Sequence, residues 1–228
     1  MIRLFVPDSL CPHSPVTLSP DAVHYLFHVM RLQPGDLFSA FNGRDGEWTV
    51  RLKSLNKKEG VFLPENQTKK QQNPPRLVLC PALIKKDPMD FILQKATEIG
   101  VTAIYPLITE RTVVSRLNMD RARAILIEAA EQSERLTVPE LFEPTSPDAV
   151  LKSLPTDVIP VCLAERQATD FQPTGIKPYA LFIGPEGGWT PTESDLFQKA
   201  GVSFWHLGDT ILRAETAAIA ALACCRFR

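Results

Sequence analysis

The stretch YALFIGPEGGWTPTE, residues 179–193, contains three consecutive signals that decide the fold class. Residues 179–183 are apolar or aromatic throughout, which is typical of a strand buried on both faces of a sheet. A glycine-rich loop follows at 184–189. Thr190, Pro191 and Glu193 then stand at the N-cap, first and third positions expected at the start of a helix. This order predicts one strand–loop–helix unit of an α/β protein.

The same alternation continues on both sides of this stretch. Short apolar runs predict strands at 77–80, 103–107, 158–163 and 202–207. Runs with helical spacing predict helices at 89–99, 121–135 and 214–227, and Gly100 is placed to end the first of them. Strands that alternate with helices predict a mostly parallel sheet with helices packed on it.

The N-terminal part of the chain has a different pattern. Predicted strands at 2–6, 37–41 and 48–52, with Gly-containing turn signals between the last two, indicate a small antiparallel barrel. One short helix is expected over 22–31, opened by Ser19. The polar segment 69–75 ends in two prolines and is typical of a linker. We therefore expect two domains, 1–72 and 73–228.

The charge balance narrows the possible functions. The chain has 228 residues, with 25 Lys and Arg against 26 Asp and Glu, so its formal net charge is −1. Residues 1–72 carry 9 basic and 7 acidic residues, and residues 73–228 carry 16 and 19. A generic, strongly basic nucleic-acid binder is excluded, because such affinity comes mainly from neutralising phosphates. Any contact with RNA has to be made by a local patch.

Other features of the composition bear on location and metal content. No apolar stretch reaches the roughly 20 residues that a membrane-spanning helix needs, so we expect no association with a membrane. The five cysteines have neither zinc-site spacing nor the even count of a disulfide framework. These features favour a cytoplasmic protein without a metal.

Three loops that follow predicted strands are placed to carry chemistry. They span 163–166, 184–189 and 207–213, and ligands of parallel sheets bind at the carboxyl ends of the strands. Neither the G-x-G-x-x-G nor the GK[ST] phosphate motif occurs, which disfavours a nucleotide-binding protein of either kind. The glycines at 184–188 fit a tight strand-to-helix turn and also fit close approach of a ligand. The charged residues Glu186 in this loop and Arg213 at a helix start favour the second interpretation, that these loops bind a ligand.

Several segments together give a more specific result. They are HYLFHVMRLQPGD (24–36), FILQKATEIGV (91–101), Glu110-Arg111, EAAEQSER (128–135), Val138-Pro139, IGPEGGW (183–189) and LGDTILRAETA (207–217). Through these segments the chain resembles the bacterial 16S ribosomal RNA uridine N3-methyltransferases of the SPOUT superfamily. The segments span nearly the whole chain in the family's order.

The resemblance implies a fold, a cofactor and an assembly. The fold is an α/β domain whose parallel sheet ends in a C-terminal trefoil knot, preceded by a small PUA-like β-barrel that helps to hold RNA. The family binds S-adenosylmethionine in the knot loops and works as a homodimer. The residues that match its cofactor-binding loops are Leu163, Ile183, Gly184, Gly188, Leu207, Gly208, Ile211 and Leu212.

The implied reaction is methylation of N3 of a uridine in 16S rRNA, which we expect in the assembled 30S subunit. Uridine N3 must lose a proton before it attacks the methyl carbon, so a proton acceptor or stabilising cations are needed. Glu186 is the candidate carboxylate, and Arg213 and Arg111 are the candidate catalytic cations, with Lys95 as a further cation. The candidate RNA contacts are Arg3, Arg31, Lys85, Lys86 and Lys95.

The chain departs from the family's pattern at Thr210 and near Pro88, where a basic residue is common. Two alternative functions are methylation of another RNA, such as tRNA or 23S rRNA, and RNA binding by a catalytically silent assembly factor. The match at 24–36 argues against the first alternative. The intact loops at 184–188 and 207–213 argue against the second.

Overall fold

The structure, a computed structural model, describes residues 1–227 except 165–168, 171–172, 174 and 176. The described chain forms two compact units. The first comprises Met1–Asn73 and Ala130–Val138, and the second comprises Pro74–Ala129 and Pro139–Arg228. Residues 130–138 therefore pack with a part of the chain from which they are far removed in sequence.

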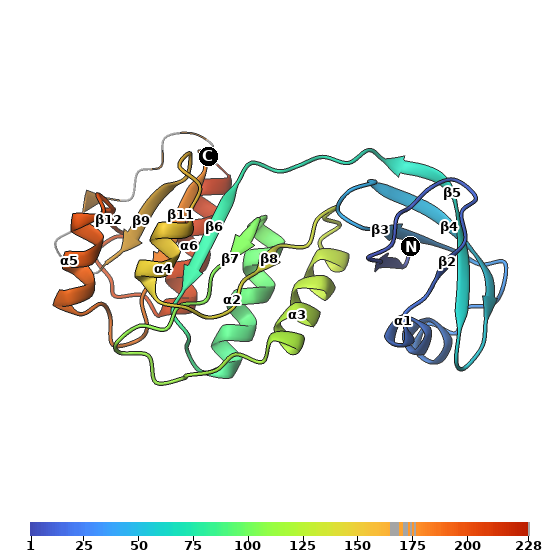
Figure 1. The fold of residues 1–228 in the computed structure, drawn as a ribbon, viewed down its shortest axis with the longest axis horizontal. Coiled ribbons are helices and arrows are strands. Elements are labelled where there is room, and N and C mark those ends of the chain that lie inside the picture. Colours follow the sequence, from blue (N-terminus) through green and yellow to red (C-terminus); the bar gives the residue numbers. More distant parts are fainter. Residues whose placement is uncertain (165–168, 171–172, 174, 176, 228) are drawn as a thin grey trace. The chain divides into compact units, whose positions relative to one another are not determined.

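The first unit contains a five-stranded sheet (Figure 1). The strand order is β1 (Arg3–Phe5), β3 (Leu37–Phe41), β4 (Glu47–Leu55), β5 (Gly60–Lys69) and β2 (Val16–Thr17). β1 pairs with β3 in parallel, whereas the other pairs are antiparallel. The expectation of antiparallel pairing throughout was wrong for β1, because the long connection through β2 and the helical segment brings the chain back in the same direction.

The helical segment of this unit has two parts. α1 (Pro20–His24) begins at Ser19, whose hydroxyl accepts a hydrogen bond from the backbone N–H of Ala22. The chain then widens into the π-helical turn η1 (Tyr25–Val29). The sequence predicted one helix over 22–31, and it gave no sign of the wider turn. Leu26 in this turn is fully buried, and Phe38 and Phe62 belong to the same apolar core.

The second unit contains a seven-stranded sheet in which every pair is parallel (Figure 1). The strand order is β10 (Thr169–Asp170), β12 (Ser203–His206), β9 (Ile159–Leu163), β11 (Tyr179–Ile183), β6 (Leu77–Pro81), β7 (Ala103–Ile104) and β8 (Glu140–Leu141). All five residues of β11 are buried, as its apolar sequence predicts. The prediction of an α/β fold with a parallel sheet is thereby confirmed.

Helices pack on both faces of the parallel sheet (Figure 1). α6 (Ala214–Arg226) lies against β11 and β6 and against α2 (Lys86–Ile99), which ends at Gly100 with a φ of +110°. On the other face, Phe197 of α5 (Pro191–Lys199) and Val150 of α4 (Pro147–Ser153) share a core with Phe182. α3 (Met119–Gln132) runs from the second unit into the segment that belongs to the first.

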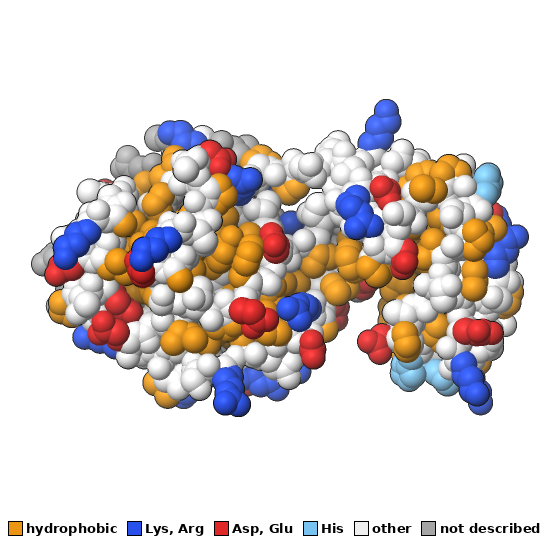
Figure 2. Space-filling view, in the orientation of Figure 1, with side chains coloured by type: hydrophobic (Ala, Val, Ile, Leu, Met, Phe, Trp, Pro, Cys, Tyr) orange, Lys and Arg blue, Asp and Glu red, His pale blue; other side chains and the backbone are white. Residues whose placement is uncertain are grey.

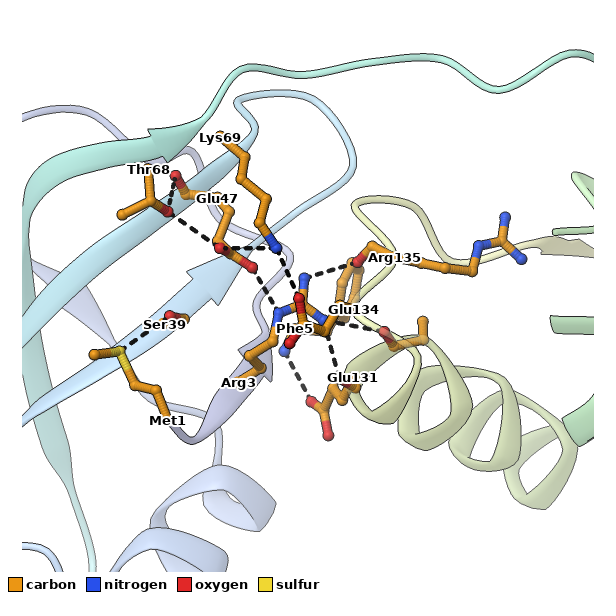
Figure 3. A network of polar contacts seen from close by, with 11 residues as sticks. Met1, Arg3, Phe5, Ser39, Glu47, Thr68, Lys69, Glu131, Glu134 and Arg135 are labelled. Carbon is orange, nitrogen blue, oxygen red and sulfur yellow. Dashed lines mark hydrogen bonds and ion pairs between the residues drawn. The ribbon is translucent and has the colours of Figure 1, made fainter. Parts of the chain in front are cut away.

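Arg3 is a structural residue of the first unit (Figure 3). Its side chain is only 7% exposed, and its Nε donates to Glu47 Oε2 at 2.6 Å. Its Nη atoms donate to the backbone carbonyls of Ala130, Glu131 and Arg135 at 2.9–3.1 Å. From the sequence, Arg3 is a candidate RNA contact. The structure corrects this, because the guanidinium is buried and its hydrogen bonds join the first strand to the end of α3.

Glu47 is the buried acidic partner of Arg3. Burial by itself would raise the pKa of its carboxyl group, because a low-polarity environment disfavours the charged form. The hydrogen bond and positive charge of Arg3, together with Lys69 and Thr68, outweigh burial and hold the pKa of Glu47 below its ordinary value. Glu47 is therefore ionised in the folded protein at neutral pH.

We expect Arg3→Ala to destabilise the protein by roughly 3–5 kcal/mol, because it leaves the Glu47 carboxylate buried without its partner. The free energy of unfolding in urea measures this loss. The matched control is Arg51→Ala, which removes an ion pair with Glu65 from a much more exposed position. The control should cost far less, because water replaces an exposed partner readily. Equal losses in the two variants would contradict a structural role for Arg3.

A second prediction concerns pH. Because folding lowers the pKa of Glu47, its contribution to stability is present above its ordinary pKa of 4.5 and is lost as the pH falls through the folded value. The difference in unfolding free energy between the wild type and Glu47→Gln should therefore shrink between pH 7 and about pH 3. Urea unfolding of both proteins across this range tests it, and a difference independent of pH would refute it.

Candidate functional site

A cavity of about 490 Å³ lies in the second unit where β9, β11 and β12 end. Parallel strands that are neighbours end at the same edge of the sheet, so their loops meet there. The residues proposed from the sequence for cofactor binding line this cavity, as do those proposed for catalysis, with the exception of the further cation Lys95. They are Arg111, Leu163, Ile183, Gly184, Glu186, Gly188, Leu207, Gly208, Ile211, Leu212 and Arg213. Glu165 and Arg166 of the first predicted loop lie outside the described residues.

The glycine loop, residues 184–189, follows β11 directly. A Cβ atom added to Gly184 would lie 3.2 Å from Cε2 of Trp189, so the backbone passes close under the indole ring. The indole Nε1 donates to the carbonyl of Leu163 at 3.0 Å, which fastens this loop to the end of β9. Gly188 has a φ of +68°, a conformation that favours glycine. No signal in the sequence indicated this role of Trp189.

Arg111 reaches the glycine loop from a distant part of the chain. Its Nη1 donates to the carbonyl of Gly187 at 2.6 Å and lies 3.4 Å from the carbonyl of Trp189. A Cβ added to Gly187 would lie 3.3 Å from Cβ of Arg111, so glycine permits this close packing. The positive charge predicted for the site is thus present, and it is held against the loop backbone.

Glu193 connects the end of the glycine loop to the segment that contains Arg111. Its predicted capping box is present, because the Thr190 hydroxyl accepts from the Glu193 N–H and Glu193 Oε2 accepts from the Thr190 N–H. Glu193 Oε1 also accepts from the backbone N–H of Glu110 at 3.0 Å. The capping motif identifies Glu193 from the sequence, but nothing local in the sequence indicates its second partner.

The third loop, residues 207–213, leads into α6. Gly208 has a φ of +107°, and a Cβ there would meet no atom within 4 Å. Ile211 is 70% exposed, and Arg213 stands at the N-cap of α6 with its side chain exposed. His206 lines the cavity as well, with Nδ1 at 3.2 Å from the Gly208 nitrogen and Nε2 at 3.1 Å from Asp170. No motif in the sequence marks His206 as a residue of this site.

The lining fits a molecule that carries an apolar ring together with polar or positively charged groups. Its volume lies within the range of roughly 300–1,000 Å³ typical of small-molecule sites. The apolar side chains come mainly from the strand ends and from the loop 207–213, and Gly184, Gly188 and Gly208 leave the backbone accessible. Glu186 and Asp209 supply carboxylates that suit a cationic group.

The remaining predicted RNA contacts lie outside this cavity. Arg31, in the first unit, is exposed and follows η1 with a φ of +55°. Lys85 and Lys86, in the second unit, are exposed at the start of α2, whereas Lys95 forms an ion pair with Glu98 at 2.8 Å. On the face shown in Figure 2, Lys and Arg side chains are interspersed with Asp and Glu. Basic side chains on that face are scattered among acidic ones and form no broad basic surface there.

Two features are absent from the described residues. No helix in this part of the chain is long and apolar enough to span a membrane. No group of three or more His, Cys, Asp or Glu residues within the same ranges is arranged to hold a metal ion.

Comparison with known families gives a match for each part of the chain. The family model described as an RNA methyltransferase domain matches residues 71–226. The family model described as an RNA methyltransferase PUA domain matches residues 18–64. The α/β unit and the preceding unit are thus matched by two families that are both named for RNA methyltransferases.

Individual relatives cover almost the whole chain. Ribosomal RNA small subunit methyltransferase E of Rickettsia conorii is 33% identical over 97% of this chain and 93% of its own length. The protein of the same name from Synechocystis is 35% identical over 97% of this chain and 76% of its own length.

Solved structures agree with these matches. That of ribosomal RNA small subunit methyltransferase E from Neisseria gonorrhoeae, bound to S-adenosylmethionine, aligns with a TM-score of 0.89 and 32% identity over 98% of this chain and 95% of that one. A Legionella pneumophila protein in complex with the same cofactor aligns with a TM-score of 0.90 and 31% identity over 97% and 95% of the two chains. The chain therefore belongs to the RNA methyltransferase family of ribosomal RNA small subunit methyltransferase E.

Proposed function

We propose that this protein uses S-adenosylmethionine to methylate N3 of a specific uridine in 16S rRNA, within the assembled 30S subunit. The observation that carries the proposal is a cavity lined by Arg111 and by described residues of all three sequence-predicted loops. Family membership supports the reaction class, and the match at 24–36 supports the choice of substrate.

The cavity residues divide into those that hold the cofactor and those that act on the substrate. S-adenosylmethionine supplies an electrophilic methyl group attached to a positively charged sulfur. The apolar side chains of the cavity would enclose the adenine ring, and backbone groups of its glycines would contact the polar edge of that ring. The apolar residues are Leu163, Ile183, Leu207, Ile211 and Leu212, and the glycines are Gly184, Gly188 and Gly208. Holding the methyl carbon in line with the attacking nitrogen contributes much of the rate enhancement.

The proton on uridine N3 has to leave before the nitrogen can attack. Glu186 is exposed at the cavity, where its carboxylate accepts this proton or stands beside the positive sulfur. Arg213 and Arg111 line the same cavity and stabilise the negative charge that develops on the uracil ring.

The rest of the molecule holds the RNA. We assign RNA contacts to Arg31, Lys85, Lys86 and Lys95, and we assign residues 1–72 to an RNA-binding domain and 73–228 to the methyltransferase domain. We further propose a cytoplasmic homodimer whose loops at 184–189 and 207–213 are part of a C-terminal trefoil knot. The exposed apolar side chains of Val113 and Phe227 in the second unit are available for the subunit contact.

The methylation prediction is tested with 30S subunits from cells that lack the activity. Incubation with methyl-labelled S-adenosylmethionine should place one label at N3 of a uridine in 16S rRNA, mapped by nuclease digestion and mass spectrometry. A near-neutral protein depends on the shape of folded RNA, so naked 16S rRNA should be a much poorer substrate. Label in tRNA or 23S rRNA, or cofactor binding without any transfer, would favour one of the alternative functions.

We expect Glu186→Gln to lower kcat by roughly 10²–10⁴-fold at neutral pH if Glu186 is the proton acceptor. The loss should shrink at alkaline pH, where uridine N3 gives up its proton to solvent. A carboxylate that instead neutralises the sulfur would raise the Kd of the cofactor with less effect on kcat. Asp209→Asn is the matched control, because it neutralises another carboxylate of the same cavity. Unchanged turnover of Glu186→Gln at every pH would exclude Glu186 as the base.

A further inference from the structure

We propose that Glu193 is a positioning residue that holds the glycine loop and Arg111 in the arrangement the cavity needs. This inference rests on the proposed function, because the cavity it concerns is the proposed cofactor site. Glu193 does not line the cavity. It acts through backbone groups of the two segments that do.

The first observation is the burial and full use of the Glu193 carboxylate. The residue is 6% exposed. Oε2 accepts from the N–H of Thr190 at 2.9 Å, and Oε1 accepts from the N–H of Glu110 at 3.0 Å. A buried carboxylate is costly unless it is hydrogen-bonded, and here each oxygen has a backbone donor.

The second observation is that the two donors lie on different segments. Thr190 follows the glycine loop directly, whereas Glu110 lies 83 positions before Glu193. Capping of α5 requires only the bond to Thr190. The bond to Glu110 is additional, and it fixes the backbone at the residue immediately before Arg111.

The third observation is that Arg111, the residue after Glu110, is itself hydrogen-bonded to the glycine loop. Arg111 donates to the carbonyls of Gly187 and Trp189, the latter being the residue before Thr190. The chain therefore forms a ring of hydrogen bonds that runs from Glu193 to Glu110, through Arg111 to the glycine loop, and back through Thr190. A break at either Glu193 or Arg111 frees the same loop, so side chains at both positions act as one unit.

The chemistry of the ring requires a carboxylate of this length. Two N–H donors face the side chain, and only an ionised carboxylate offers two acceptors and no donor. Glu193→Gln turns one N–H₂ group toward a backbone N–H, which leaves that donor unpaired. Glu193→Asp keeps the charge and the helix cap, but its side chain is one methylene shorter and cannot span both donors.

The test measures two properties of Glu193→Gln and Glu193→Asp. In the protein without cofactor, the backbone amide of Glu110 should exchange its hydrogen faster than in the wild type. The Kd for S-adenosylmethionine, measured by calorimetry, should rise by roughly tenfold, the effect of losing one hydrogen bond to a charged group. If Glu193→Gln does not fold, Glu193→Asp retains the cap and carries the test.

The matched control is Ser146→Ala. Ser146 caps α4 in the second unit as Thr190 caps α5, by accepting a hydrogen bond from the N–H of Ala149. Its removal should lower stability without changing the Kd for S-adenosylmethionine or the exchange at Glu110. An equal rise in Kd for this control would show that lost stability alone explains the effect, and the positioning role of Glu193 would be wrong.

The double variant Glu193→Gln/Arg111→Ala separates positioning from independent binding contributions. If both residues hold the same loop, the double variant should bind S-adenosylmethionine no more than about twofold more weakly than Arg111→Ala alone. If the increases in Kd caused by the two substitutions multiply in the double variant, the proposal is wrong. It is also wrong if the Glu193 variants keep the wild-type Kd and the wild-type rate of hydrogen exchange at Glu110. Faster exchange at Glu110 in a protein whose wild type does not bind S-adenosylmethionine would support the ring of hydrogen bonds but refute the proposed function.

Discussion

Burial of β11 on both faces of the parallel sheet is the constraint on which the rest of the second unit depends. Its residues 179–183 pair with β9 on one side and β6 on the other, so Ile183 lies in register with Leu163 and with Pro81. Helices cover both faces, and the chain can leave this strand only at the carboxyl edge of the sheet. The glycine loop therefore emerges beside Leu163 and Ala164 at the end of β9 and beside the loop that follows β12, and the cavity forms where they meet.

Loops placed together by strand register still have to be held in shape. Three side chains do this through backbone groups: Trp189 bonds to Leu163, Arg111 bonds to Gly187, and Glu193 bonds to Glu110. Each of these bonds joins segments that are distant in sequence. A site held in this way loses less conformational entropy when its ligand binds. This favours tight binding and correct alignment of the reacting atoms.

In the first unit, too, a buried charged side chain joins segments that are distant in sequence, but there it stabilises the fold. Arg3 and Glu47 are a buried ion pair, and Arg3 also occupies the carbonyls at the end of α3. A positive charge at the carboxyl end of a helix is favourable, and here it connects that end to the first strand. The number of basic residues in 1–72 therefore overstates the positive charge available to RNA, because the guanidinium of Arg3 is buried and paired with Glu47.

The sequence by itself determined those features of the structure that depend only on residues close together along the chain. The apolar run at 179–183, the glycines after it and the Thr190–Glu193 capping box are local signals, and each appears in the structure where it was expected. The family motifs identified the residues that line the cavity.

Only the tertiary structure decided the parallel pairing of β1 with β3, the buried place of Arg3, and the hydrogen bond between the Glu193 carboxylate and the Glu110 N–H. The physical reason is the distance between partners along the chain: a charged side chain looks the same in the sequence whether it faces solvent or a donor many residues away. Short strands such as β8 and β10 were missed for a related cause, since two residues carry too little pattern and their pairing comes from the sheet beside them.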